Sequence, residues 1–229
     1  MKLYSLITAG ILGATLASQG AVTITNAGFE DPAHGANDGT NPTGWTVYES
    51  LGGVETVKQI RTRNNFQNTG AMGVQVGAGQ SNHDGELYQT VATVIGQEYT
   101  FSIYAAASSR APSPATQNFT VDLLAGTAVA GAPATGGSLS GNSLSQLATV
   151  SDGGTLGTTF QEFTVNFTAT SIDTTIWIYD NSTAAANDFN DIILDDVSIG
   201  KKVSIPESTS SALLGGLLAL SAVMVRRRR

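Results

Sequence analysis

The stretch that decides the fold is Glu98–Ala106, EYTFSIYAA, in which large apolar side chains alternate with mostly polar ones. Tyr99, Phe101 and Ile103 occupy every second position, so they share one face of an extended strand, and that face is expected to be buried. Residues 161–169, QEFTVNFTA, repeat the same alternation. Strands that each bury one face predict sheets packed against each other.

Similar short runs of Thr, Val, Ile, Phe and Tyr recur along the chain between Gly and Asn, and no stretch of a dozen residues keeps a helical apolar period. We expect strands at Val22–Thr25, Trp45–Tyr48, Val54–Ile60, Ala71–Val76, Glu86–Val91, Glu98–Ala106, Asn118–Leu124, Leu147–Val150, Gln161–Ala169, Thr174–Tyr179 and Asp191–Ile199. Residues 125–157 are expected to form an elaborated hairpin or long loop. The pattern predicts an all-β fold, an antiparallel two-sheet β-sandwich of the jelly-roll type, over residues 22–200.

Residues 174–179 carry apolar side chains on both faces of the expected strand. Ile176 and Ile178 lie on one face, and Trp177 and Tyr179 lie on the other. Such a strand either lies between two layers or presents its aromatic rings to a cleft.

The N-terminal 21 residues have the pattern of a secretory signal peptide. Lys2 precedes an apolar stretch at residues 6–16, and small residues follow at Ser18, Gly20 and Ala21. Cleavage after Gly20 or Ala21 would leave about 185 mature residues, enough for one sizeable core. The chain has no cysteine, so disulfides contribute nothing to its stability.

The C-terminal end has three consecutive parts. Residues 201–211 form a linker, residues 212–225 are uncharged, and the chain closes on Arg226, Arg227, Arg228 and Arg229. Fourteen residues make a helix of about 21 Å, shorter than the roughly 30 Å of a bilayer core. We expect a short transmembrane helix with the arginines on the cytoplasmic side and the preceding domain outside.

This tail resembles the PEP-CTERM sorting signal of Gram-negative bacteria, which exosortase proteases recognise. The usual Val-Pro-Glu-Pro is here Ile205–Ser208, so Pro206 and Glu207 are kept and the second proline is missing. The resemblance implies a membrane-held precursor that is cut near Pro206 and passed to the cell surface or extracellular matrix. The alternative is a permanent C-terminal anchor with a stop-transfer charge.

The segment 22–206 is acidic. It contains six Lys and Arg against 17 Asp and Glu, a net charge of −11. Such a surface repels nucleic acid and anionic lipid and attracts divalent cations.

Six short motifs follow one another across the segment 22–200. They are Asn26–Glu30, Gly44–Trp45, Tyr88–Val91, Gly96–Phe101, Phe160–Phe163 and Ile193–Ile199. Their order resembles the galactose-binding-like jelly rolls, in particular the carbohydrate-binding modules grouped with xylan- and glucan-binding families four, nine and twenty-two. The resemblance implies a β-sandwich that binds extracellular polysaccharide, for example the exopolysaccharide of a biofilm matrix.

The same resemblance implies a structural calcium ion held by Glu30 and by Asp195 or Asp196. A hard cation takes several oxygen ligands, which these carboxylates and nearby carbonyls can supply. Strict alternation would put Asp195 on the apolar face of Val197 and Ile199, and Asp196 on the opposite face. An unpaired carboxylate on an apolar face is costly, so Asp195 is favoured as the calcium ligand over Asp196. The alternative is a solvated acidic edge or a helix-like cap at Glu30.

Sugar-binding sandwiches stack pyranose rings on exposed aromatic side chains. The aromatic residues whose faces could be open are Trp177, Tyr179, Tyr48 and Tyr104. Arg61 and Arg63 could serve as their polar partners in a sugar site. Trp45, Tyr88 and Tyr99 are expected in the core. A buried Trp177 would favour a structural or adhesive matrix protein without a sugar site.

No arrangement of residues points to catalysis. His34 and His83 are the only histidines, no serine elbow or His-x-x-x-His spacing occurs, and cysteine is absent. We therefore expect a non-catalytic protein, with a glycan-active enzyme as the remaining alternative because two carboxylates can meet in any fold.

Overall fold

The computed structural model describes residues 22–31, 41–49, 60–64, 66–76, 85–107, 117–128, 139, 143–154, 156–181 and 192–202. Ten β-strands occupy this part of the chain, and no α-helix does. Their bounds are β1 Thr46–Glu49, β2 Ile60–Asn64, β3 Met72–Val76, β4 Gly85–Ala92, β5 Glu98–Ala107, β6 Phe119–Ala125, β7 Ser145–Ser151, β8 Gln161–Thr168, β9 Asp173–Asp180 and β10 Ile192–Lys201. The predicted all-β fold is confirmed.

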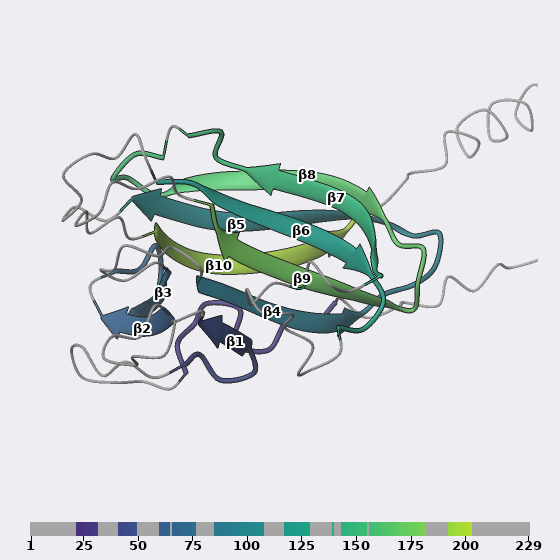
Figure 1. Ribbon diagram of the computed structural model, residues 1–229, viewed down its shortest axis with the longest axis horizontal. Coiled ribbons are helices and arrows are strands. Elements are labelled where there is room, and N and C mark those ends of the chain that lie inside the picture. The colour runs from purple at the N-terminus through teal and green to yellow at the C-terminus, as the bar shows by residue number, and fades with distance from the viewer. Residues whose placement is uncertain are drawn as a thin grey trace, which may run out of the picture.

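The strands form two five-stranded antiparallel sheets that lie face to face (Figure 1). Sheet A has the order β1-β4-β9-β6-β7, and sheet B has the order β2-β3-β10-β5-β8. Neighbouring strands are often distant in sequence, as for β4 beside β9 and β3 beside β10. This non-local pairing is what the antiparallel sandwich predicted from the sequence requires.

The core between the sheets is built from the residues that alternate inward. Tyr99, Phe101 and Ile103 of β5 are fully buried, as the 98–106 pattern predicted. Phe167 of β8 stacks on Tyr99 with ring centroids 5.3 Å apart. The Tyr99 hydroxyl accepts a hydrogen bond from the Val94 N–H at 3.0 Å, so the one polar atom of this core side chain is satisfied.

The strand predicted at Val22–Thr25 is wrong. Residues 25–28 form a turn, and the backbone of Thr25 is hydrogen-bonded to a side chain instead of a neighbouring strand. Gln89 Oε1 accepts from the Thr25 N–H at 2.7 Å, and Gln89 Nε2 donates to the Thr25 carbonyl at 2.9 Å. The turn carries Phe29 into the core, where it packs on Trp45 at 5.3 Å.

The strict alternation assumed for residues 193–199 is also wrong, because β10 contains a β-bulge. Its register with β5 shifts between Asp195 and Ser198, and Asp196 has φ +48°. An extra residue reverses the alternation, so Leu194 and Val197 both face the core. Asp195 consequently lies on the face of sheet B that points away from the core.

The predicted signal peptide, most of Val54–Ile60, the linker with Pro206 and Glu207, the 212–225 helix and the four arginines lie outside the described residues. Within the described ranges, no helix has the length and hydrophobicity needed to cross a membrane.

Candidate functional site

The outer face of sheet A carries a second apolar cluster, separate from the core. Trp177 and Tyr179 of β9 point to this face, with ring centroids 4.5 Å apart and an interplanar angle of 32°. Leu124 and Leu139 pack against Trp177, and Tyr88 lies at the edge of the cluster. Trp177 is only 9% exposed, so it is a packing residue, whereas Tyr179 is half-buried.

Two buried carboxylates flank these rings. The Trp177 Nε1–H donates to Glu86 Oε2 at 2.9 Å from the neighbouring β4. On the other side, Asp122 of β6 accepts from Gln146 Nε2 at 3.0 Å and from the Tyr179 hydroxyl at 3.4 Å. Burial raises the pKa of Tyr179, and the charge of Asp122 raises it further. The face therefore combines aromatic rings with hydrogen-bond acceptors of negative charge.

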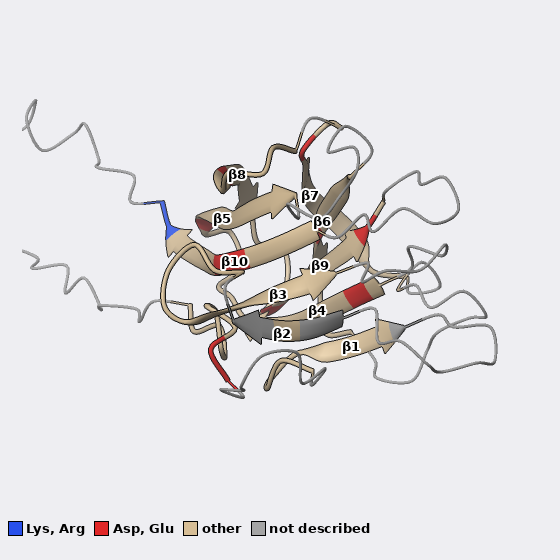
Figure 2. Ribbon diagram, turned by 90° about the vertical axis from the view of Figure 1, so that its left-hand side faces the viewer, with Lys and Arg blue, Asp and Glu red and all other residues tan. Residues whose placement is uncertain are grey.

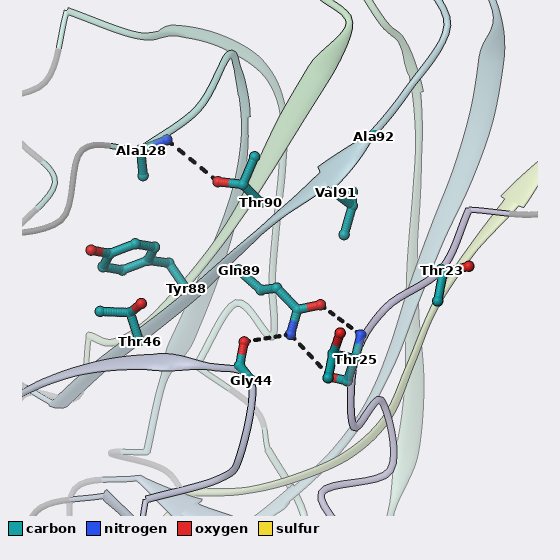
Figure 3. Close-up of a pocket in the computed structure, with 10 residues that line it drawn as sticks. All are labelled: Thr23, Thr25, Gly44, Thr46, Tyr88, Gln89, Thr90, Val91, Ala92 and Ala128. Atoms are coloured by element: carbon teal, nitrogen blue, oxygen red, sulfur yellow. Dashed lines mark hydrogen bonds between the residues drawn. The ribbon is translucent and has the colours of Figure 1, made fainter.

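An open pocket of about 380 Å³ adjoins this cluster along β4 (Figure 3). Tyr88 and Thr46 stand side by side at its wall, since they are register partners in β4 and β1. The remaining lining residues are Thr23, Thr25, Gly44, Gln89, Thr90, Val91, Ala92 and Ala128. The lining thus offers one half-buried aromatic ring and several threonine hydroxyls.

Some of these polar groups are already engaged and others are available. Gln89 Nε2 also donates to the Gly44 carbonyl at 3.0 Å, so its amide holds the pocket wall together. The Thr90 and Thr175 hydroxyls lie 2.9 Å apart. Thr46 and Thr23 are exposed, and within the part of the chain that the structure describes their hydroxyls have no hydrogen-bond partner. A ligand rich in hydroxyl groups matches such a lining.

The residues predicted to bind a ligand are divided between the two sheets. Tyr48, Trp177 and Tyr179 share the outer face of sheet A, on which Thr46 and Tyr48 pair with Tyr88 and Glu86. The other three lie in sheet B, Tyr104 on β5 and Arg61 and Arg63 on β2. The two groups of residues thus belong to different sheets of the sandwich.

Sequence reasoning missed the outward position of Tyr88, which was expected in the core. Leu87 and Val91 of β4 are buried between the sheets, so the intervening Tyr88 must face outward. That alternation was readable from residues 86–91. Nothing in the sequence singled out Glu86 or Asp122, because their partners come from other strands.

Glu30, Asp195 and Asp196 all lie near Gly28 and beside residues 68–72. A Cβ at Gly28 would lie 3.8 Å from Asp195 Oδ1, 3.6 Å from Asp196 Oδ1 and 3.8 Å from the Glu30 Cγ. Strict alternation predicted that Asp195 and Asp196 lie on opposite faces, which is wrong: because of the bulge, both side chains reach residues 68 and 69.

Each carboxylate accepts hydrogen bonds from that segment. Asp195 Oδ2 accepts from the N–H groups of Asn68 and Thr69 at 2.7 and 3.0 Å, and Glu30 Oε1 accepts from the Ala71 N–H at 2.9 Å. Asp196 accepts from the Asn68 and Thr69 side chains. Burial raises the pKa of Asp195 to about 6, although its backbone hydrogen bonds act in the opposite direction.

This donor set consists of oxygens only, which suits a hard cation such as Ca²⁺. In the described ranges, however, no three His, Cys, Asp or Glu side chains converge as a metal-binding group. The three carboxylates therefore match calcium in donor type only, and their oxygens are turned toward the N–H and side-chain donors of residues 68–72.

The fold is similar to that of solved carbohydrate-binding modules, which are also β-sandwiches. The structure of TmCBM61 in complex with β-1,4-galactotriose matches with a TM-score of 0.50 and 14% identity, covering 78% of this chain and 97% of that one. The CBM22-1–GH10 modules of Clostridium thermocellum xylanase 10B, complexed with xylohexaose, match with a TM-score of 0.44 and 18% identity, over 80% of this chain and 28% of that one. At such identities the likeness concerns the fold alone.

The chain belongs to the HpiC1-like family, the family of the HpiC1 cyclase. The sequence model of this family matches residues 20–178, which include β1 to β8 and most of β9. No curated protein matches the sequence.

Proposed function

We propose that this protein is an exported, non-catalytic β-sandwich that binds extracellular polysaccharide at the cell surface or in the matrix. The observation that carries the proposal is the open pocket beside Tyr88, with its threonine hydroxyls and its position next to the Trp177–Tyr179 cluster. An aromatic ring beside hydroxyl and carboxylate groups is the chemistry that recognises a sugar. The TmCBM61 structure holds a galactotriose on a sandwich of this type, so β-linked glycans are the first ligands to test.

The buried Trp177 supports a second candidate, a structural or adhesive matrix protein. A ring that is 9% exposed and bonded to Glu86 cannot stack on a sugar without rearrangement. In a matrix protein of this kind, the outer face of sheet A would serve only to stabilise the fold. Polysaccharide binding therefore depends on Tyr88 and not on Trp177.

A glycan array probed with the 22–206 fragment tests the proposal. Retention of a defined set of β-linked glycans, unchanged in length after incubation, is the expected result. Shortened or otherwise converted glycans would instead identify a glycan-active enzyme, for which Glu86 and Asp122 are the carboxylates at hand. Binding to no glycan would favour the matrix scaffold.

We also propose that Glu30, Asp195 and Asp196 hold a structural calcium ion, which ties the N-terminal turn and the β10 bulge to residues 68–72. The support is the donor set described above and the charge of −11 on residues 22–206. Calcium would offset the cost of burying the Asp195 carboxylate. It would act on stability and take no part in ligand contact, because it lies on sheet B.

The C-terminal tail is proposed to be a sorting signal cut by an exosortase. In a host with an exosortase, the wild-type protein is expected to run smaller than its precursor, whereas the double variant Pro206→Ala, Glu207→Ala stays full length in the membrane fraction. Neutral replacements of Arg226–Arg229 should let the short apolar segment slip through the bilayer. Identical processing of wild type and double variant, or no processing of either, would leave a permanent anchor.

A further inference from the structure

The exposed large hydrophobic side chains of the described chain gather at one end of the sandwich. They are Val94, 40% exposed, Ile95, 61% exposed, and Ile172, 67% exposed. Val94 and Ile95 belong to the turn between β4 and β5, and Ile172 belongs to the turn between β8 and β9. We call these three residues the apolar tip.

Hydrogen bonds between the two turns make the apolar tip one surface. The Thr93 N–H donates to the Ile172 carbonyl at 2.7 Å, and the Gly96 N–H donates to the Ala169 carbonyl at 2.8 Å. The Val94 N–H is fixed to the buried Tyr99 hydroxyl. These hydrogen bonds hold the three apolar side chains at one place on the surface, so their exposure does not result from fraying of the turns.

The chain leaves the sandwich at the same end. After β10, the Lys202 N–H donates to the Glu98 carbonyl at 2.9 Å, and Gln97 Nε2 donates to the Lys202 carbonyl at 3.3 Å. Glu98 and Gln97 directly follow the turn that carries Val94 and Ile95. Nine residues, 203–211, then separate this point from the apolar segment 212–225. Nine residues span at most about 30 Å, so a tail embedded in a bilayer holds the apolar tip close to that bilayer.

Two of the domain's few basic residues lie at this end, near the acids Glu98 and Asp173. Lys201 ends β10 and Lys202 follows it, where Figure 2 shows blue at the end of the strand. Lys202 Nζ lies 3.5 Å from Glu98 Oε2, which balances that acid. Elsewhere the described domain is dominated by acidic residues, which an anionic lipid surface would repel.

We propose that the apolar tip rests in the interfacial layer of the bilayer while the C-terminal segment anchors the precursor. Insertion of Ile95 and Ile172 would orient the sandwich with its apolar tip and the C-terminal end of β10 toward the membrane. This arrangement presents the cleavage region at the membrane face. The inference depends on the membrane-embedded tail of the proposed function and adds a second contact to it.

The absence of cysteine makes the test direct, since a single introduced cysteine can be labelled without background. Full-length Ile95→Cys and Ile172→Cys carry an environment-sensitive fluorophore and are reconstituted into phosphatidylcholine vesicles. The matched control is Ser151→Cys, an exposed position at the opposite end of sheet A. All three positions are exposed, so the substitutions leave the core untouched and are expected to leave the melting temperature unchanged. Measuring the melting temperature of each variant checks that it is folded.

The expected result is a blue-shifted emission for the probes at residues 95 and 172, with at least twofold stronger quenching by shallow doxyl-labelled lipid than at residue 151. Equal quenching at all three positions, in protein that floats with the vesicles, overturns the proposed contact and leaves the anchor intact. Protein that does not float contradicts the anchor and the contact together. A blue shift without vesicles that grows with protein concentration assigns the apolar tip to a second copy of the chain and overturns the lipid contact.

Discussion

Replacing Gly73 with alanine is expected to lower the free energy of unfolding by about 3 kcal/mol or more. Gly73 lies in β3, where the segment that begins at Phe66 crosses the outer face of sheet B. A Cβ at residue 73 would stand 1.8 Å from the Phe66 carbonyl oxygen and 2.9 Å from its carbon. A backbone carbonyl cannot rotate away as a side chain can, so the segment would have to lift off the sheet.

Gly200→Ala is the matched control for that substitution. Gly200 lies in β10 of the same sheet, and a Cβ there would meet nothing within 4 Å. Its free energy of unfolding should stay within about 0.5 kcal/mol of the wild type. Urea denaturation of the two variants measures the difference, and coincident transition midpoints would mean that residues 66–71 do not lie against β3 as described.

Removing calcium is expected to lower the melting temperature of the 22–206 fragment. A ligand bound only to the native state at a hundred times its dissociation constant adds about 2.7 kcal/mol, which corresponds to about 5–10 °C in a domain of this size. Thermal unfolding with excess calcium and with excess chelator gives this shift directly. Asp195→Ala should lose the chelator response, because Asp195 contributes both a carboxylate and the contact with residues 68 and 69.

Asp152→Ala is the control for the calcium experiment. Asp152 is also a buried carboxylate that accepts backbone hydrogen bonds, from Phe119 at 3.0 Å and Gly154 at 3.2 Å. Its loss should destabilise the fold yet leave the chelator response in place. Identical melting curves with calcium and with chelator in the wild type would show that hydrogen bonds alone hold Glu30, Asp195 and Asp196.

The strands were predictable where one face is buried and the other is not. Residues 98–106 and 161–169 carry their alternation in the sequence itself, and the structure contains them as β5 and β8, which pair with each other. The strand at Val22–Thr25 failed because its partner is the side chain of Gln89, which lies 64 residues further along the chain. No local pattern encodes such a contact.

The residues of the candidate site were harder to predict from the sequence than the strands, because they are brought together by pairing between strands that are distant in sequence. Glu86 meets Trp177 only through the pairing of β4 with β9, and Asp122 meets Tyr179 only through the pairing of β6 with β9. The bulge at Asp196 redirects Asp195 by one position, an effect that depends on a single residue with positive φ. Alternation within one strand cannot predict either kind of feature.

The most direct test of polysaccharide binding compares Tyr88→Ala with Tyr104→Ala. Both tyrosines are half-buried, but Tyr88 lines the pocket on sheet A and Tyr104 lies on sheet B. Melting curves first confirm that both variants are folded. Affinity electrophoresis then compares their migration in gels that contain the glycan to which the wild-type fragment binds. We expect Tyr88→Ala to lose affinity about tenfold or more, which corresponds to about 1.4 kcal/mol, and Tyr104→Ala to migrate like the wild type. Equal retention of the two folded variants, or a larger loss for Tyr104→Ala, would contradict a sugar site on the outer face of sheet A.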